Sequence, residues 1–293
     1  MNQQRSPTIR RRRLGAEMRR HREAAGVTID TVAARIGCSM SKVSRIETGH
    51  TSATPADVQN ILDIYGVDDA IKMELVQIAR EARQKGWWHP FSTVLTGAYV
   101  GLEAAARAVR TYEQQVIPGL LQSEEYAIAM IRAARLGDRI EEIEQRVHVR
   151  MARQSLLTSD DPIDLRVVLD EAVLSRPVGG DEVMRDQLRR LIEAARLPNV
   201  TLQILPFDVG AHAGMDGTFA ILEFEEERDA DVVFTENATG GLFLEKFEEL
   251  EKYNAIFEAI QATALDPDAS TQMMELLVEE PLWKLKRRVS EST

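Results

Sequence analysis

Cysteine, aromatic side chains and long apolar runs are all scarce in this sequence. The single cysteine, Cys38, excludes an internal disulfide and a cysteine-rich zinc site, which agrees with a reducing compartment. No stretch approaches the roughly 18 apolar residues that a membrane helix needs. The first 13 residues hold five arginines and no apolar core, so they do not form a signal peptide. These absences predict a cytoplasmic protein that needs no membrane.

Positive and negative charges are also unevenly distributed along the chain. Up to Thr54 the chain has 11 basic and 4 acidic residues, a net charge of +7, whereas the rest carries −18 and the whole chain −11. A basic segment attracts polyanions and an acidic one repels them. With 293 residues and 44% hydrophobic content, the chain is long enough for at least two packed cores. We therefore expect a nucleic-acid-binding domain at the N-terminus, followed by an acidic domain.

Glycines and capping residues divide residues 14–66 into four short helices. The first is expected over residues 14–25 and ends at Gly26, a residue that readily adopts the left-handed conformation. Thr28 caps the second helix, and Gly37 ends it. The fourth opens at Thr54-Pro55, with a cap followed by proline at the first helical position. The N-terminal domain is therefore predicted to be all-α.

The second and third helices have the pattern of a helix-turn-helix. Ala33 and Gly37 supply the small residue and the tight turn that a steep crossing requires. In the third helix Val43 and Ile46 are expected to face inward. The side chains expected to point outward are Met40, Ser41, Lys42, Ser44 and Arg45. A helix of this kind fits the major groove of B-DNA. The second helix carries one apolar stripe, formed by Ile29, Val32, Ala33 and Ile36.

This segment, TIDTVAARIGCSMSKVSRIETGHTSATP from Thr28, resembles the Xre or phage-repressor type of helix-turn-helix. The resemblance implies DNA contacts, with Arg45 as the best candidate to bind guanine O6 and N7. It also implies that helix N-termini hold phosphates. The alternative, a helical bundle that binds no DNA, leaves the outward polar side chains and the +7 charge unexplained. The predicted DNA-binding residues are Thr28, Ser39, Met40, Ser41, Lys42, Ser44, Arg45 and His50, of which Ser44 is equally compatible with plain surface.

Four consecutive arginines, Arg10, Arg11, Arg12 and Arg13, precede this motif. One interpretation is a flexible arm that reaches into a minor groove or along a phosphate path. The alternatives are a solvated charge run, or an extension of the first helix in which Arg19, Arg20 and Arg22 are also solvated. All four arginines are therefore included as candidate DNA contacts.

The rest of the chain divides at an aromatic junction. We expect domains at residues 1–83 and 101–283, a junction at 84–100 and a basic tail at 284–293. In the junction, Trp87 and Trp88 either fasten the two domains together or stack on a ligand. Residues 270–285 read as an amphipathic helix that folds onto its own core, exchanges between protomers or binds a partner.

The acidic domain is predicted to be α+β or α/β, with a small mixed sheet of about four to six strands. Four segments alternate apolar and polar residues and are rich in β-branched side chains, a pattern that is typical of strands. They are residues 164–169, 200–205, 218–224 and 231–234. The predicted helices span residues 103–115, 123–136, 138–157, 182–196 and 244–264.

Scattered motifs in this domain resemble the domain of unassigned biochemistry that follows Xre-type heads in many actinobacterial regulators. They are GWWHPF from Gly86, YEQQVIPGLLQSEEYA from Tyr112, VVLDEAVLSRPVGG from Val167, LPNVTLQILPFDVGAHAGMDGTFAILEF from Leu197 and residues 232–243. The resemblance implies a developmental or antitoxin-like regulator, often encoded beside a very small partner protein. It implies no reaction.

Candidate chemistry in the acidic domain is sparse. His212 lies among glycines with an acid nearby, yet the segment that follows reads as a strand, so a β-turn competes with a ligand site. Glu171 follows a strand, where acids are also common for solvation. Glu144 and His148 are four residues apart on one helix, but no third metal ligand is evident. We therefore predict no metal, no cofactor and no enzymatic activity.

The leading hypothesis is a homodimeric, nucleoid-associated transcriptional regulator that binds double-stranded DNA. Its acidic domain would hold the dimer and sense a small-molecule effector or a small neighbour-encoded protein. One alternative is an antitoxin-like protein that binds such a neighbour and uses DNA only for autoregulation. The other is an enzyme fused to a DNA anchor, in which His212 or Glu171 would act.

Overall fold

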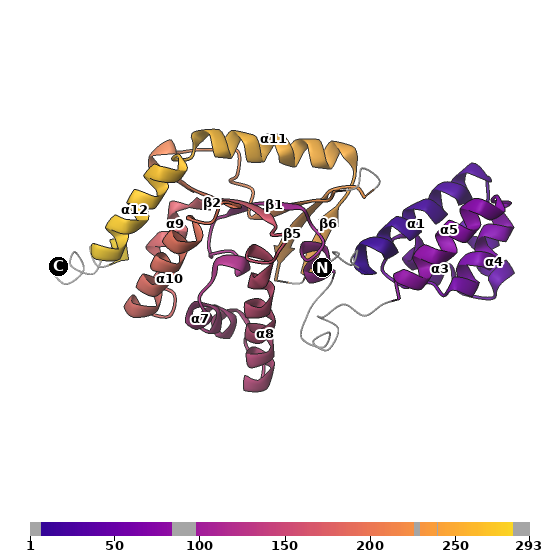
Figure 1. Cartoon of the computed structure of the whole chain (residues 1–293), viewed down its shortest axis with the longest axis horizontal. Coiled ribbons are helices and arrows are strands. Elements are labelled where there is room, and N and C mark those ends of the chain that lie inside the picture. The colour runs from indigo at the N-terminus through magenta and orange to yellow at the C-terminus, as the bar shows by residue number, and fades with distance from the viewer. Residues whose placement is uncertain (1–6, 84–97, 226–228, 239, 284–293) are drawn as a thin grey trace. The chain divides into compact units, whose positions relative to one another are not determined.

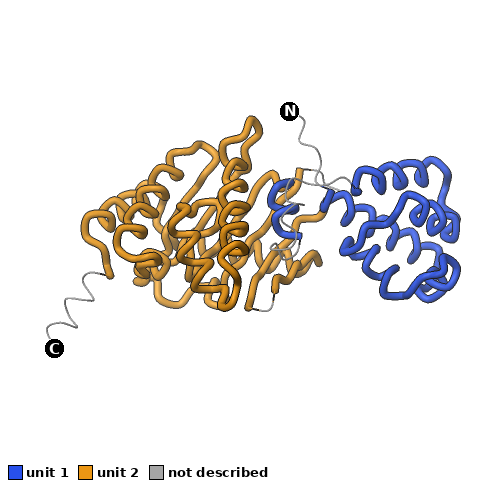
Figure 2. The backbone as a smooth tube through the Cα atoms, turned by 90° about the horizontal axis from the view of Figure 1, so that it is seen from below, with its two compact units in different colours: residues 1–90, 98–105, 226–229 blue, residues 91–97, 106–225, 230–293 orange. Residues whose placement is uncertain are grey.

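The computed structural model describes residues 7–83, 98–225, 229–238 and 240–283. The chain forms two compact units, coloured separately in Figure 2: residues 1–90, 98–105 and 226–229, and residues 91–97, 106–225 and 230–293. We call the five helices of residues 7–83 the head and the second unit the body. Trp87, Trp88 and the basic tail lie outside the described residues, as does most of the predicted junction.

The head is a bundle of five helices, which confirms the predicted all-α fold: four follow the helices expected over residues 14–66, and a fifth comes after them. Its core is continuous and includes Leu14, Val32, Val43 and Leu62, each at most 2% exposed. The five helices are α1 (Pro7–Ala24), α2 (Ile29–Ile36), α3 (Met40–Glu47), α4 (Pro55–Tyr65) and α5 (Asp69–Glu81).

Local signals set the boundaries of the head helices. The hydroxyl of Thr28 accepts a hydrogen bond from the Thr31 amide and starts α2. Thr54 and Asp57 form a reciprocal capping box at the start of α4. Gly37 ends α2 with a φ of 68°, a left-handed conformation that suits glycine. These signals depend on neighbours in the sequence, and all were predicted.

The body contains one mixed sheet of six strands in the order β3-β2-β1-β4-β5-β6. Strands β1, β2 and β3 are parallel, and β4, β5 and β6 continue the sheet in antiparallel pairs. This confirms the predicted small mixed sheet. The strands are β1 (Ala108–Glu113), β2 (Asp164–Asp170), β3 (Val200–Leu205), β4 (Phe219–Glu223), β5 (Val232–Asn237) and β6 (Gly240–Leu244).

Helices cover both faces of this sheet. On one face lies α11 (Phe247–Thr263); α7 (Glu124–Ala134), α8 (Ile140–Arg153) and α10 (Asp181–Ala194) lie on the other (Figure 1). The helix α12 (Pro267–Glu279) packs against α10 and β3. The remaining elements are α6 (Tyr99–Glu103), which clusters with the first unit, α9 (Glu171–Ser175) and the short 3-10 turns η2 (Gly119–Leu121), η3 (Gln154–Leu157) and η4 (Phe207–Val209).

The prediction was wrong for the central strand β1. Residues 103–115 are rich in alanine, arginine, glutamate and glutamine, which favour helix, and were predicted to form one. In the structure Ala108–Glu113 pairs with β2 on one side and β4 on the other. Pairing on two sides and burial of Val109 and Tyr112 outweigh local propensity here.

Two further boundaries differ from the predictions. Strand β6 was not predicted, because its two glycines weaken the strand pattern, and Leu244 ends this strand instead of opening the helix that follows. Helix α1 begins seven residues earlier than predicted, at Pro7, since Thr8 and Ile9 are buried. In the described part of the chain, no helix is both long and apolar enough to span a bilayer.

Candidate nucleic-acid interface

Helix α3 has an inward apolar side and an outward polar side. Val43 and Ile46 are 1% and 2% exposed, as predicted. Met40 is 53% exposed, which leaves its thioether available to a ligand. The other outward residues, all exposed, are Ser41, Ser44 and Arg45, and His50 lies exposed just after the helix.

The N-termini of α2 and α3 both begin with an exposed hydroxyl residue. The Ser39 hydroxyl accepts from the Lys42 amide over 3.2 Å, just as Thr28 accepts from Thr31. Each cap uses one of the free amides of its helix and leaves the preceding ones directed outward. Amides in this arrangement, together with the helix dipole, favour a phosphate.

The two basic residues of α3 differ in their surroundings. Lys42 places its ammonium 3.5 Å from the Asp57 carboxylate, which links α3 to the start of α4. Arg45 is exposed, and no hydrogen bond or ion pair of its guanidinium is found among the described residues. Arg45 is therefore the α3 cation that is free to form bidentate bonds with an external acceptor.

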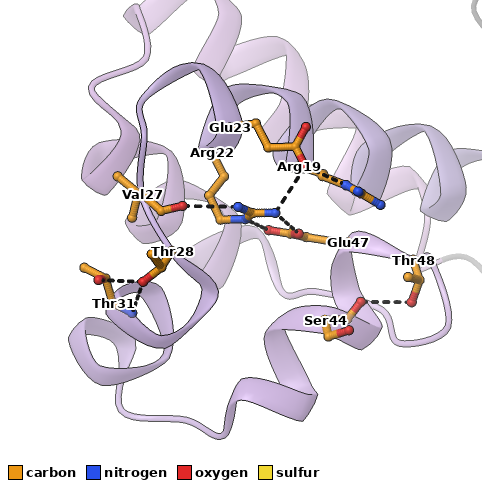
Figure 3. Close-up of polar contacts among 9 residues, drawn as sticks. All are labelled: Arg19, Arg22, Glu23, Val27, Thr28, Thr31, Ser44, Glu47 and Thr48. Carbon is orange, nitrogen blue, oxygen red and sulfur yellow. Dashed lines mark hydrogen bonds and ion pairs between the residues drawn. The ribbon is translucent and has the colours of Figure 1, made fainter.

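A buried ion pair holds α3 against α1 (Figure 3). The Nε and Nη2 atoms of Arg22 donate to the two carboxylate oxygens of Glu47, over 2.7 and 3.0 Å. Its Nη1 donates to the Val27 carbonyl over 3.1 Å, so one guanidinium joins α1, the turn before α2 and the end of α3. The hydrogen bond to Glu47 raises the pKa of Arg22 above its ordinary value.

The same crossing needs a glycine. A Cβ atom on Gly15 would lie 2.5 Å from the Ile46 carbonyl oxygen and 2.6 Å from that of Glu47, so only glycine allows α1 and α3 to approach this closely. The pKa of Tyr65 is raised, mainly by burial and to a smaller extent by the negative charge of Glu47. The orientation of α3 is therefore set by contacts at its inner side.

Of the interpretations of the arginine run, the flexible arm is wrong, and the extension of the first helix is confirmed. Arg10 to Arg13 lie within α1 (Pro7–Ala24), where Arg10 pairs with Glu81 over 3.2 Å and Arg13 with Glu74 over 3.8 Å. The side chain of Arg11 donates to the Thr8 hydroxyl over 3.2 Å. Arg22 is likewise not solvated. These pairings with α5 tie the start of α1 to the bundle, and contact of the four arginines with DNA stays a prediction.

In the body, Glu171 and His212, the two candidate ligand-binding or catalytic residues, make different contacts. The Glu171 carboxylate accepts from the Phe207 amide over 2.9 Å and anchors the turn after β3. His212 instead lies beside Asp170 and Tyr112: its Nε2 is 3.8 Å from the carboxylate and 3.5 Å from the hydroxyl. Among the described residues, no hydrogen bond or ion pair joins Glu171 to His212.

Both ring nitrogens of His212 are engaged within the chain. The Gly214 amide donates to Nδ1 over 3.1 Å, so in the neutral ring the proton is on Nε2, facing Asp170. The Tyr112 hydroxyl lies 3.3 Å from Asp170, and burial raises the pKa of Tyr112. This cluster fastens the loop between β3 and β4 to the ends of β1 and β2.

Sequence reasoning missed Arg22, Glu47, Tyr112 and Asp170. The first two are 25 residues apart, so no local pattern joins them. Tyr112 was placed in a predicted helix, which hid its position at a strand end. Among the described residues, no group of three histidine, cysteine, aspartate or glutamate side chains is arranged to hold a metal ion, and Glu144 and His148 have no third ligand.

Two family models match the chain. Residues 13–75 match a helix-turn-helix domain, and residues 96–275 match a domain of unknown function, DUF5753. No curated protein and no solved structure matched the chain.

The head is thus a helix-turn-helix domain, which is the class found in DNA-binding regulators. Because the second match covers more than half of its residues, the chain belongs to the DUF5753 family.

Proposed function

We propose that this protein is a sequence-specific transcriptional regulator of the Xre type that reads the DNA major groove with α3. The observation that carries the proposal is the outer side of α3, where Arg45 is exposed and unpaired among the described residues while Val43 and Ile46 hold the helix in the core. The +7 charge up to Thr54 supplies the attraction to DNA.

In this proposal, contacts divide into base readers and phosphate anchors. Arg45 binds a guanine, Met40 touches a thymine methyl and Ser41 bonds to a base edge. The amides behind Thr28 and Ser39 hold phosphates, and they set the register without reading sequence. Lys42, Ser44 and His50 extend the same surface.

The protein acts as a homodimer, because one head contacts few phosphates and this type of motif usually reads inverted repeats. Half-sites lie about 34 Å apart, one turn of B-DNA. The body holds the dimer and responds to an effector or to a small neighbour-encoded protein, as in actinobacterial regulators of this architecture. The protein works in the cytoplasm on the nucleoid. We assign it no catalytic reaction.

The test is a comparison of Arg45→Ala with wild type on a selected site and on random DNA. Removal of a bidentate guanine contact is expected to cost about 1–3 kcal/mol of discrimination, roughly 5- to 150-fold, at the base that Arg45 reads. Titration by fluorescence anisotropy at fixed salt measures both affinities.

Arg35→Ala is the matched control, because Arg35 is exposed but lies on α2 (Ile29–Ile36). It should change the two affinities by the same factor. Equal losses on selected and random DNA for Arg45→Ala would refute the assignment of Arg45 as a base reader. Failure to enrich any sequence from a random pool would refute sequence-specific binding altogether.

A further inference from the structure

The two edge strands of the body sheet, β3 and β6, differ in the partners of their outward backbone groups. At the β3 edge, the Ile204 amide donates to the Ser270 hydroxyl and the Ile204 carbonyl accepts from the Leu265 amide, each over 2.9 Å. At the opposite edge, Gly240–Leu244 pairs only with β5 in the described part of the chain. An edge strand directs the N–H and C=O of alternate residues outward. Among the described residues, the β3 edge is thus capped at Ile204, whereas β6 has no neighbouring strand beyond β5.

Strand β6 also lacks the features that usually protect an open edge. Proline, charged side chains and bulges commonly block strand addition, and Gly240–Leu244 contains neither proline nor charge. Leu242 is 55% exposed and Phe247, just after the strand, is 70% exposed. Gly241 is fixed in place by the Phe234 ring, which a Cβ atom would meet at 2.2 Å. This edge is thus regular, uncharged and partly apolar.

We propose that β6 is the dimer interface of this protein, and that Gly240–Leu244 pairs antiparallel with the same strand of a second copy. The two six-stranded sheets then join into one. The inference rests on the proposed function, which calls for two heads, and it names the surface that brings the copies together.

Symmetry and charge both favour a second copy as the occupant. An antiparallel strand pairs with its own copy about a two-fold axis, the symmetry of most homodimers and of an inverted repeat. Two acidic bodies repel, so they approach most closely where charge is absent, and residues 237–244 carry none. A basic partner would instead prefer the stretch from residue 245 to 280, which has ten acidic residues and two lysines.

The length of the strand predicts the register. With the two-fold axis at Leu242, all five residues of Gly240–Leu244 find a partner, and any other centre pairs fewer. Leu242 then lies directly opposite its own copy, with Cβ atoms about 4.5–5.5 Å apart. This separation is close to the span of a disulfide.

The first test is a cross-link in the full-length chain. With Cys38→Ser as background, Leu242→Cys is expected to form a covalent dimer on mild oxidation. Thr201→Cys, on the opposite edge strand β3 (Val200–Leu205), is the matched control and should remain monomeric on a denaturing gel without reductant. Equal cross-linking of both variants, or none at Leu242→Cys, would overturn the proposed register.

The second test needs no cross-link. Leu242→Lys places two like charges opposite each other, so sedimentation equilibrium should give the 32.9 kDa monomer, whereas wild type gives twice this mass. Leu136→Lys is the control, because Leu136 is 91% exposed in the loop after α7 and its substitution should leave the dimer intact. A monomeric wild type, or a dimeric Leu242→Lys variant, would overturn the interface.

The two proposals fail separately. Leu242→Lys should keep its affinity for a half-site and lose the added affinity for an inverted repeat, because each head is unchanged. If Leu242→Lys stays dimeric while Arg45→Ala loses discrimination, the interface is wrong and the regulator stands. If wild type dimerises through Leu242 but binds no DNA, the regulator is wrong and the interface stands.

Discussion

Glu113 is a carboxylic acid in surroundings that favour its neutral form. It ends β1, and burial, followed by the negative charge of Glu236 on β5, raises its pKa to about 8. The Thr111 hydroxyl donates to it over 3.3 Å and Arg150 on α8 stabilises its charge, but both effects are smaller than burial. At neutral pH this residue is therefore largely protonated.

The stability of the body should consequently fall as pH rises from about 4.3, the ordinary pKa of glutamate, to about 8. In this window the folded chain holds a proton on Glu113 that the unfolded chain has lost. The free energy of unfolding therefore decreases as pH rises, and this decrease ends above pH 8. Glu113→Gln removes this contribution.

Urea unfolding at pH 5 and at pH 8 measures this contribution of Glu113 to stability. Wild type should lose more stability between the two than Glu113→Gln does. Glu144→Gln, on the exposed side of α8, should behave as wild type. Parallel pH profiles for Glu113→Gln and wild type would contradict the role of Glu113.

At the scale of elements, α3 is a short helix that depends on its supports. Its eight residues make too few internal hydrogen bonds to be stable alone. Gly15 lets α1 approach closely, and Arg22 binds Glu47 at the end of the helix. These contacts at the inner side of α3 thus fix where the helix lies in the head, and with it the position of Arg45.

Arg22→Met should destabilise the head by about 3 kcal/mol, because it leaves the Glu47 carboxylate buried without its partner. Hydrogen-exchange mass spectrometry of the full chain would detect this as faster exchange in α1 and α3, with the body unchanged.

Arg20→Met is the control, since Arg20 lies on the same helix with its side chain 67% exposed and should change exchange little. A double variant, Arg22→Met with Glu47→Leu, should recover part of the loss. If the double variant were as unstable as the sum of its parts, the ion pair would not be the cause.

At the scale of the whole molecule, the chain consists of two units with separate cores. Leu62 is central to the head core, and Ile221 lies between the sheet and α11 in the body; neither is exposed. Charge is separated in the same way, with the basic part at the DNA-binding end and the acidic part elsewhere.

Calorimetry should therefore show two unfolding transitions. Leu62→Ala should lower the free energy of unfolding of the head by about 2–5 kcal/mol, and Ile221→Ala should lower that of the body by the same amount. Each substitution should shift the transition of its own unit to lower temperature and leave the other transition in place. A single transition that both substitutions shift equally would show instead that the units unfold together.

Local chemistry in the sequence determined much of this protein. The helices of the head follow from caps, glycines and apolar spacing that act within four residues, and so do Val43 and Ile46 facing inward and Arg45 facing outward. The basic and acidic parts follow from composition alone. Strands β2, β3, β4 and β5 follow from alternation, because each buries one or both faces over a short, regular stretch.

Only the tertiary structure decided the rest, because the deciding contacts join distant residues. Ala108–Glu113 is a strand since β2 and β4 pair with it, against its helical composition. Arg10 and Arg13 lie in a helix that buries Thr8 and Ile9, and they meet the carboxylates of α5 only in the folded chain. Arg22 meets Glu47, and His212 meets Asp170, only after the chain has folded. A pattern within a few residues cannot encode a partner that is 25 or more residues away.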